Sequence, residues 1–79
     1  MMLSEVSWES LCVGDIVISV NGVPGEIIEL IPIERAHQRE DNEMLIRWNN
    51  GKHSLVWHFE GSRLTYDTLS TLIARNTKL

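Results

Sequence analysis

The amino-acid sequence predicts a small, mainly β domain that ends in one short helix. Short apolar segments rich in β-branched residues recur along the chain, and Gly, Pro or Asn residues separate them. Two of these segments alternate with period two around Asn50-Gly51, a dipeptide typical of β-hairpin loops. The chain has 79 residues and shows no internal repeat or linker, so we expect a single domain spanning residues 1–79.

Two helical segments are predicted, one near each end of the chain. Residues 7–11 can form a single turn that begins at Ser7, and nearby side chains should close one end of the core: Trp8, Leu11 and Val13. Near the C-terminus, Asp67 is a predicted N-cap residue. It precedes apolar residues at the i, i+3, i+4 spacing of a short amphipathic helix: Leu69, Leu72 and Ile73.

Strands are predicted where apolar and β-branched residues are dense: at residues 16–20, 26–31 and 63–66, in addition to the hairpin at residues 43–59. Asn21-Gly22 and residues 23–25 supply turn residues between the first two strands. Residues 34–42 have no apolar period and predict a polar loop, while residues 60–62 predict a turn.

The prediction for the hairpin at residues 43–59 includes its register. If Asn50-Gly51 forms a two-residue type I′ turn, Trp48 lies opposite His53 and Met44 opposite Trp57. One face then carries Met44, Ile46, Trp48, His53, Leu55, Trp57 and Phe59, and the other carries Glu43, Leu45, Arg47, Ser54, Val56 and His58. The predicted core consists of Ile16, Ile18, Val20, Ile28, Leu30, Met44, Ile46, Leu55, Trp57 and Leu64.

Two stretches of the chain resemble a known structural family. Residues 13–30, Val-Gly-Asp-Ile-Val-Ile-Ser-Val-Asn-Gly-Val-Pro-Gly-Glu-Ile-Ile-Glu-Leu, resemble the opening hairpin of SH3-like barrels of the KOW and Tudor-like kind. The phrase Ile46-Arg47-Trp48-Asn49-Asn50-Gly51 is similar to the V-x-W-[DN]-[DN]-G hairpin of small SH3-like domains. The resemblance implies a small SH3-like five-stranded bent barrel followed by the short helix.

The composition favours a binding function over catalysis. The net charge of −4 argues against strong sequence-independent binding to phosphate backbones. The single cysteine, Cys12, cannot form an internal disulfide or a cysteine-rich metal site. His37, His53 and His58 lack a ligand spacing. No phosphate-binding loop or nucleophile with a base partner is recognisable, so we expect no enzyme, no metal and no cofactor.

The leading functional hypothesis is a small binding module or accessory subunit that contacts another protein. Trp48 at the end of its strand offers a flat aromatic face, and the predicted contact set is Trp48, His53 and Tyr66, with residues 34–42 at its rim. The alternative role for Trp48 is to close the end of the core and pack on His53.

Two other hypotheses remain open at this point. A nucleic-acid-binding barrel would use cations near the outer face of the hairpin: Arg47, Lys52 and Arg63. A homo-oligomer would use the helix at residues 68–75, so the protein is expected to be a monomer or a homodimer. The first residues lack the blocks of a signal peptide and no apolar run approaches the roughly 20 residues that span a bilayer. We therefore expect no membrane contact and a cytoplasmic location.

Overall fold

The computed structural model describes residues 1–59 and 63–77; the predicted turn at residues 60–62 lies outside them. Five antiparallel strands form one sheet in the order β4-β3-β2-β1-β5. The elements are β1 (Ile16–Ile18), β2 (Pro24–Ile31), β3 (Glu43–Trp48), β4 (His53–Trp57), β5 (Thr65–Tyr66) and the helix α1 (Thr68–Thr77). The prediction of a mainly β fold with a C-terminal helix is confirmed. The described sheet is open, with β4 and β5 at its edges, so closure into a barrel stays a prediction.

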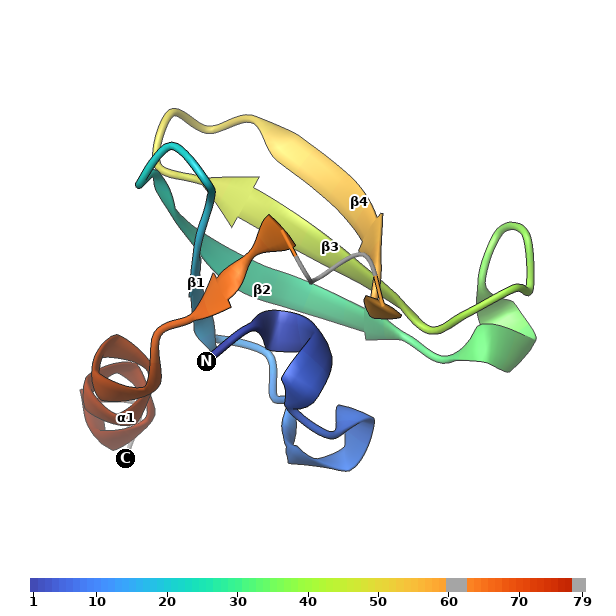
Figure 1. The fold of residues 1–79 in the computed structure, drawn as a ribbon, viewed down its shortest axis with the longest axis horizontal. Helices are drawn as coiled ribbons and strands as arrows, with labels where there is room; N and C mark the ends of the chain where they lie inside the picture. The colour runs from blue at the N-terminus through green and yellow to red at the C-terminus, as the bar shows by residue number, and fades with distance from the viewer. Residues whose placement is uncertain (60–62, 78–79) are drawn as a thin grey trace.

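The sheet is flanked by short turns at one end of the chain and by α1 at the other. Figure 1 shows β2, β3 and β4 as the long strands, with β5 and the N-terminal segment in front of them. That segment contains two 3-10 turns, Leu3–Glu5 and Trp8–Ser10, and the second confirms the predicted turn at residues 7–11. A third, Ile33–Arg35, begins the loop that projects between β2 and β3 (Figure 1).

The β3–β4 hairpin closes with a three-residue loop, Asn49 to Gly51, instead of the predicted two-residue loop. The amide of Trp48 donates to the carbonyl of Lys52 (2.8 Å), and the amide of Gly51 donates to the carbonyl of Trp48 (2.9 Å). Gly51 has a φ of 86°, whereas Asn50 does not adopt a positive φ. These features belong to a type I turn followed by a left-handed residue, and they exclude the type I′ turn, which needs positive φ at both central residues.

The extra loop residue shifts the strand pairing by one. Arg47 lies opposite His53 and Glu43 lies opposite Trp57, so the predicted pairing of Trp48 with His53 and of Met44 with Trp57 is wrong. Because side chains alternate with period two, this shift exchanges the two faces of β4 relative to β3. Ser54 and Val56 join the inner face, while His53, Leu55 and Trp57 join the outer face, contrary to the prediction.

The core lies between the inner face of the sheet and the N-terminal turns. Its buried apolar residues are Leu3, Val6, Leu11, Val17, Ile27, Met44, Ile46 and Leu64, with Trp8, Leu30, Trp48, Val56 and Tyr66 packed against them. The core predictions for Met44, Ile46 and Leu64 are confirmed, and Leu30 is a partly buried neighbour of the core. Leu11 is buried as predicted, but Val13 is exposed.

Several other predicted core residues face outward because β1 and β4 turn the opposite face inward. Val17 is the buried residue of β1. In β2, Ile27 is buried just before an irregularity between Ile27 and Glu29 that shifts the pairing with β3. The residues that lie outside the buried core are Ile16, Ile18, Ile28 and Trp57, all half-buried, and Val20 and Leu55, both exposed. The loop at residues 34–42 is polar, as predicted, except that Ala36 is buried.

Candidate interaction surfaces

The helix α1 is fastened to the sheet through its polar face. Its N-cap is Asp67, as predicted, whose carboxylate accepts a hydrogen bond from the amide of Ser70 (3.0 Å). That hydrogen bond lowers the pKa of Asp67. Thr71, one turn later, is buried, and its hydroxyl accepts from the amide of Ile16 (2.8 Å) and donates to the carbonyl of Ile16 (3.4 Å). The helix thus continues the hydrogen bonding of β1 where β5 ends.

A buried carboxylate holds the second half of α1. Asp15 is fully buried and receives the Arg75 guanidinium on both oxygens, with Nε to Oδ1 at 2.9 Å and Nη2 to Oδ2 at 2.8 Å. The amide of Cys12 and the hydroxyl of Tyr66 also donate to Oδ2, at 2.9 Å and 3.1 Å. Burial, together with the charge of Asp15, raises the pKa of Tyr66, and the hydrogen bond to Asp15 raises the pKa of Arg75. This cluster explains why α1 is attached without an apolar contact face.

The apolar face of α1 points to solvent. Leu69 is 70% exposed, Leu72 52% and Ile73 56%. These residues have the i, i+3, i+4 spacing that normally packs against a core. The polar residues Thr71 and Arg75 instead contact the body of the domain, so the usual orientation of an amphipathic helix is reversed. Because contiguous exposed apolar patches are characteristic of interaction sites, this face of α1 is a candidate interaction surface.

A second apolar surface lies on the outer side of β4. Leu55 is 44% exposed, and the exposed Phe59 ring stacks obliquely against Trp57 with ring centroids 5.6 Å apart. The indole Nε1 of Trp57 donates to Glu43 Oε2 (3.2 Å), which is buried between Trp57 and His37. Burial by itself raises the pKa of Glu43, but hydrogen bonds from His37 and Trp57 outweigh it and lower the pKa. A cavity of about 280 Å³ lies beside Glu43, Leu55 and Trp57.

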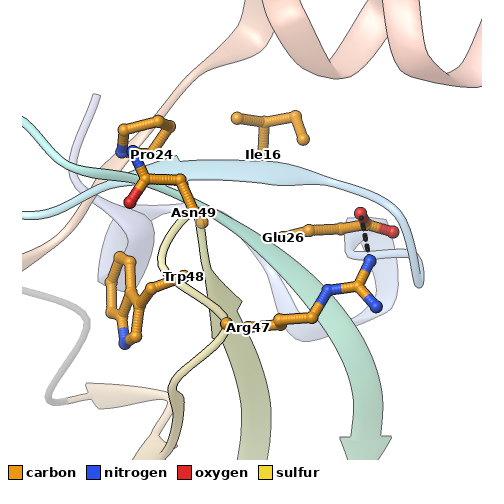
Figure 2. Close-up of a pocket in the computed structure, with 8 residues that line it drawn as sticks. Ile16, Pro24, Glu26, Arg47, Trp48 and Asn49 are labelled. Carbon is orange, nitrogen blue, oxygen red and sulfur yellow. Dashed lines mark hydrogen bonds and ion pairs between the residues drawn. The ribbon is translucent and has the colours of Figure 1, made fainter.

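Trp48 occupies the inner face at the end of β3. Its ring lies over Gly25 of β2, so close that a Cβ on Gly25 would be 2.6 Å from Trp48 Cε3. Its indole Nε1 donates to the hydroxyl of Ser54 (2.8 Å). An open cavity of about 360 Å³ lies beside the strand end, and Figure 2 shows the indole of Trp48 and the side chain of Arg47 directed away from one another. The packing of Trp48 is that of a side chain closing the core end.

The predicted protein-contact residues do not form one surface. Trp48 and Tyr66 lie in one row across the sheet, because Tyr66 pairs with Val17, Val17 with Gly25, and Gly25 with Trp48. Both are half-buried on the inner face. His53 is exposed on the outer face, opposite Arg47.

The predicted nucleic-acid residues are all exposed but are only partly together. Arg47 forms an ion pair with Glu26 at 3.2 Å, drawn as a dashed line in Figure 2. Lys52 follows the loop of the same hairpin, whereas Arg63 lies beyond β4, before β5. The Glu26 carboxylate offsets the charge of Arg47, which weakens the case for a phosphate-binding patch there.

The residues that sequence reasoning missed are the buried acids and their partners. Asp15 and Arg75 are far apart in the sequence, and no local pattern joins them. Glu43 lies on the outer face, as predicted, but His37 and Trp57 cover it. The local sequence feature that could have indicated the buried Glu43 is its position directly before an alternating apolar run.

Within residues 1–59 and 63–77, no group of three or more potential metal ligands lies close enough to hold an ion. Among these residues there is also no helix with the length and apolar character needed to cross a bilayer. No family model, curated protein or solved structure matches the chain. The functional argument therefore rests on the geometry of the surfaces described above.

Proposed function

We propose that this chain is a non-catalytic, cytoplasmic protein-interaction module built on an SH3-like fold. The fold proposal is a strongly bent five-stranded barrel, although the described sheet is open at β4 and β5. It is supported by the strand order, in which β5 returns to pair with β1, and by the irregularity in β2, since such bulges bend a strand. The resemblance of the two hairpins to SH3-like domains supports the same fold.

The observation that carries the functional proposal is the outward apolar face of α1. A fully buried Leu or Ile side chain contributes about 1.5–3 kcal/mol, and here three such residues remain more than half exposed. Partner binding would recover this free energy. The helix needs no rearrangement to bind, because Asp67, Thr71 and Asp15–Arg75 already hold it in place.

The apolar stripe of α1, which consists of Leu69, Leu72 and Ile73, favours a partner with an apolar groove. Helices that bind in grooves use anchors at i, i+3 and i+4, which is the spacing of Leu69, Leu72 and Ile73. The accessory subunit would therefore present α1, and the partner protein would supply the concave surface. The predicted contact at Trp48, His53 and Tyr66 would be a separate region, since those side chains are divided between two faces of the sheet.

The test is affinity capture from native lysate with three forms of the protein: wild type, Leu72→Glu and Asn21→Glu. Both substitutions add one negative charge at an exposed position, but only Leu72 belongs to the apolar stripe of α1, whereas Asn21 lies in the loop between β1 and β2. We expect the wild type and Asn21→Glu to retain the same protein, and Leu72→Glu to retain about tenfold less. Equal retention by all three forms would remove α1 from the interaction.

Nuclease treatment in the same experiment distinguishes protein binding from the alternative function, nucleic-acid binding. Retention that disappears with nuclease, falls steeply with salt and depends on Arg47, Lys52 and Arg63 would replace the protein-binding proposal with nucleic-acid binding. Trp48→Ala tests the predicted aromatic contact. Because Trp48 packs against the core, a fall in the thermal midpoint with unchanged capture would assign it a structural role only.

A further inference from the structure

The two edge strands of the sheet, β5 and β4, differ in whether another segment of the chain covers them. At β5, the N-terminal segment covers the edge: the amide of Tyr66 donates to the carbonyl of Met1 (2.8 Å), and the amide of Leu3 donates to the carbonyl of Leu64 (2.9 Å). Met2 also forms a bridge with Thr65. At β4, no strand in residues 1–59 or 63–77 pairs with the outer edge. An uncovered edge presents amides and carbonyls that can pair with another strand.

The hydrogen bonds at both ends of the β3–β4 ladder identify the outward groups. The amide of Trp48 donates to Lys52, and the amide of His58 donates to Asn42, each at 2.8 Å. Antiparallel ladders alternate between hydrogen-bonded and non-hydrogen-bonded pairs. The inward-bonded residues of β4 are therefore Ser54 and Val56, and the amides and carbonyls that point away from the sheet belong to His53, Leu55 and Trp57.

This edge carries few of the features that normally prevent pairing. Residues 53–57 contain no proline, no Lys or Arg and no acid. The side chains of the three outward-bonding residues lie on the outer face, where Leu55 and the neighbouring Phe59 are exposed. A strand added here would gain main-chain hydrogen bonds and apolar contacts together.

We propose that β4 pairs antiparallel with β4 of a second copy of this chain, with the twofold axis at Leu55. In that register Leu55 lies opposite the partner's Leu55, and His53 lies opposite the partner's Trp57. The outward amides and carbonyls then supply up to about six hydrogen bonds across the axis. The self-complementary register favours a second copy over a foreign peptide: on the outer face leucine meets leucine and histidine meets tryptophan, on the inner face serine meets valine, and no like charges meet within residues 53–57.

The proposed dimer is independent of the partner groove proposed for α1. The helix lies at the opposite end of the molecule from the outer edge of β4, so a dimer would present two copies of the α1 stripe (Figure 1). Leu72→Glu should leave the dimer intact. A dimer that Leu72→Glu abolishes would instead be held by α1, which would overturn the β4 register.

Amide hydrogen exchange by NMR, combined with light scattering over a range of protein concentrations, tests the pairing. We expect a concentration-dependent dimer in which the amides of His53, Leu55 and Trp57 become protected as it forms. The amides of Ser54 and Val56 should be protected at every concentration. A monomer at all concentrations, with rapid exchange at the three outward amides, contradicts the proposal. Protection of those amides in the monomer also contradicts it, and would favour closure of the barrel within one chain.

Leu55→Pro removes one outward amide without removing a hydrogen bond to β3, because proline is tolerated at such edge positions. We expect it to weaken dimerisation by about tenfold or more. The matched control is Val20→Pro, which places proline in the exposed first position of the other hairpin loop and should leave dimerisation unchanged.

If Leu55→Pro does not fold, Leu55→Lys replaces it, because Leu55 is 44% exposed and a lysine is accommodated there in the monomer. Two lysines would then face one another on the axis, and the dimer should be lost. A dimer that persists in the folded variant would contradict the register.

Discussion

The two hairpins of this protein close with the same loop but differ in how their strands are held. In the first, between β1 and β2, Ser19 pairs with Val23 across three residues that end in Gly22. In the second, between β3 and β4, Trp48 pairs with Lys52 across three residues that end in Gly51. The two glycines have φ values of 81° and 86°, so both Asn-Gly steps lie at the end of a type I turn.

The loops are stabilised by different side chains. In the first, the Ser19 hydroxyl accepts hydrogen bonds from the amides of Asn21 (3.3 Å) and Val23 (3.1 Å). In the second, the Asn50 carboxamide oxygen accepts from the amide of Lys52 (2.9 Å). One backbone geometry is thus reached by two local sequences, which share the Asn-Gly step.

The strands beyond the loops show the larger difference. β1 lies between β2 and β5, and α1 is bonded to its first residue, Ile16. β4 has β3 on one side and no strand on the other within the described residues. The first hairpin is therefore flanked by a strand on each side, β5 and β3. The second is flanked by β2 alone, and its outer strand β4 is held by β3 and by the contacts around Glu43. The comparison teaches that equal turns do not imply equally buried strands.

The largest expected effect comes from the position where the two hairpins pack together. Gly25→Ala would place a Cβ 2.6 Å from Trp48 Cε3 and 2.8 Å from Ile46 Cγ2. Overpacking of a core typically costs about 1–3 kcal/mol, and we expect a loss in this range in urea unfolding. Replacing Trp48 by Leu in the Gly25→Ala background should recover part of it. A Gly25→Ala protein of unchanged stability would show that Trp48 does not lie over β2.

An intermediate effect is expected at the two loop glycines. A Cβ added at Gly22 or at Gly51 would meet no atom within 4 Å. The loss of stability on substitution by Ala therefore reports only the cost of holding a positive φ. We expect Gly22→Ala and Gly51→Ala each to lower the free energy of unfolding by about 1–2 kcal/mol, and by similar amounts. Asn at either position should cost less, because it tolerates the left-handed region. A much smaller loss at Gly51 than at Gly22 would favour a different turn in the second hairpin.

The smallest expected effect is a pH dependence that arises at Glu43 in the second hairpin. The lowered pKa of Glu43 means that its ionised form stabilises the fold above the usual value of 4.5, and that this stability is lost as the pH falls through the lowered pKa. Chemical shifts of the Trp57 indole N–H should report the transition, since it donates to Glu43. Glu43→Gln should remove the titration from that signal. An unchanged titration in the variant would assign it to another acid.

Much of the fold could be predicted from local sequence. The strands, the helical turn after Ser7 and the helix after Asp67 follow from β-branched runs and capping residues. The burial of β1 could not be predicted in the same way, because Ile-Val-Ile is apolar on both faces and either side could turn inward. Leu3 and Val6 were missed as core residues because their short segment has no strand or helix period of its own.

The candidate surfaces, like the fold, could be predicted only in part from local sequence. The amphipathic spacing of Leu69, Leu72 and Ile73 was visible in the sequence, but its exposure depends on Asp15, which binds Arg75 from a distant part of the chain. The outer position of Leu55 and Trp57 was predicted wrongly because it depends on one loop residue. Counting from a two-residue turn reverses every side chain of β4.

The sequence by itself determined where the backbone turns, since Asn-Gly steps and glycine tolerate the required φ, and where strands and the helix begin. Tertiary structure alone decided which face of each strand is buried and which face of α1 meets the domain. The physical reason is that local residues set backbone conformation over a few bonds, whereas burial is selected by contacts between segments far apart in the chain. In this protein the contacts of Val17, Trp48 and the Asp15–Arg75 pair made that selection.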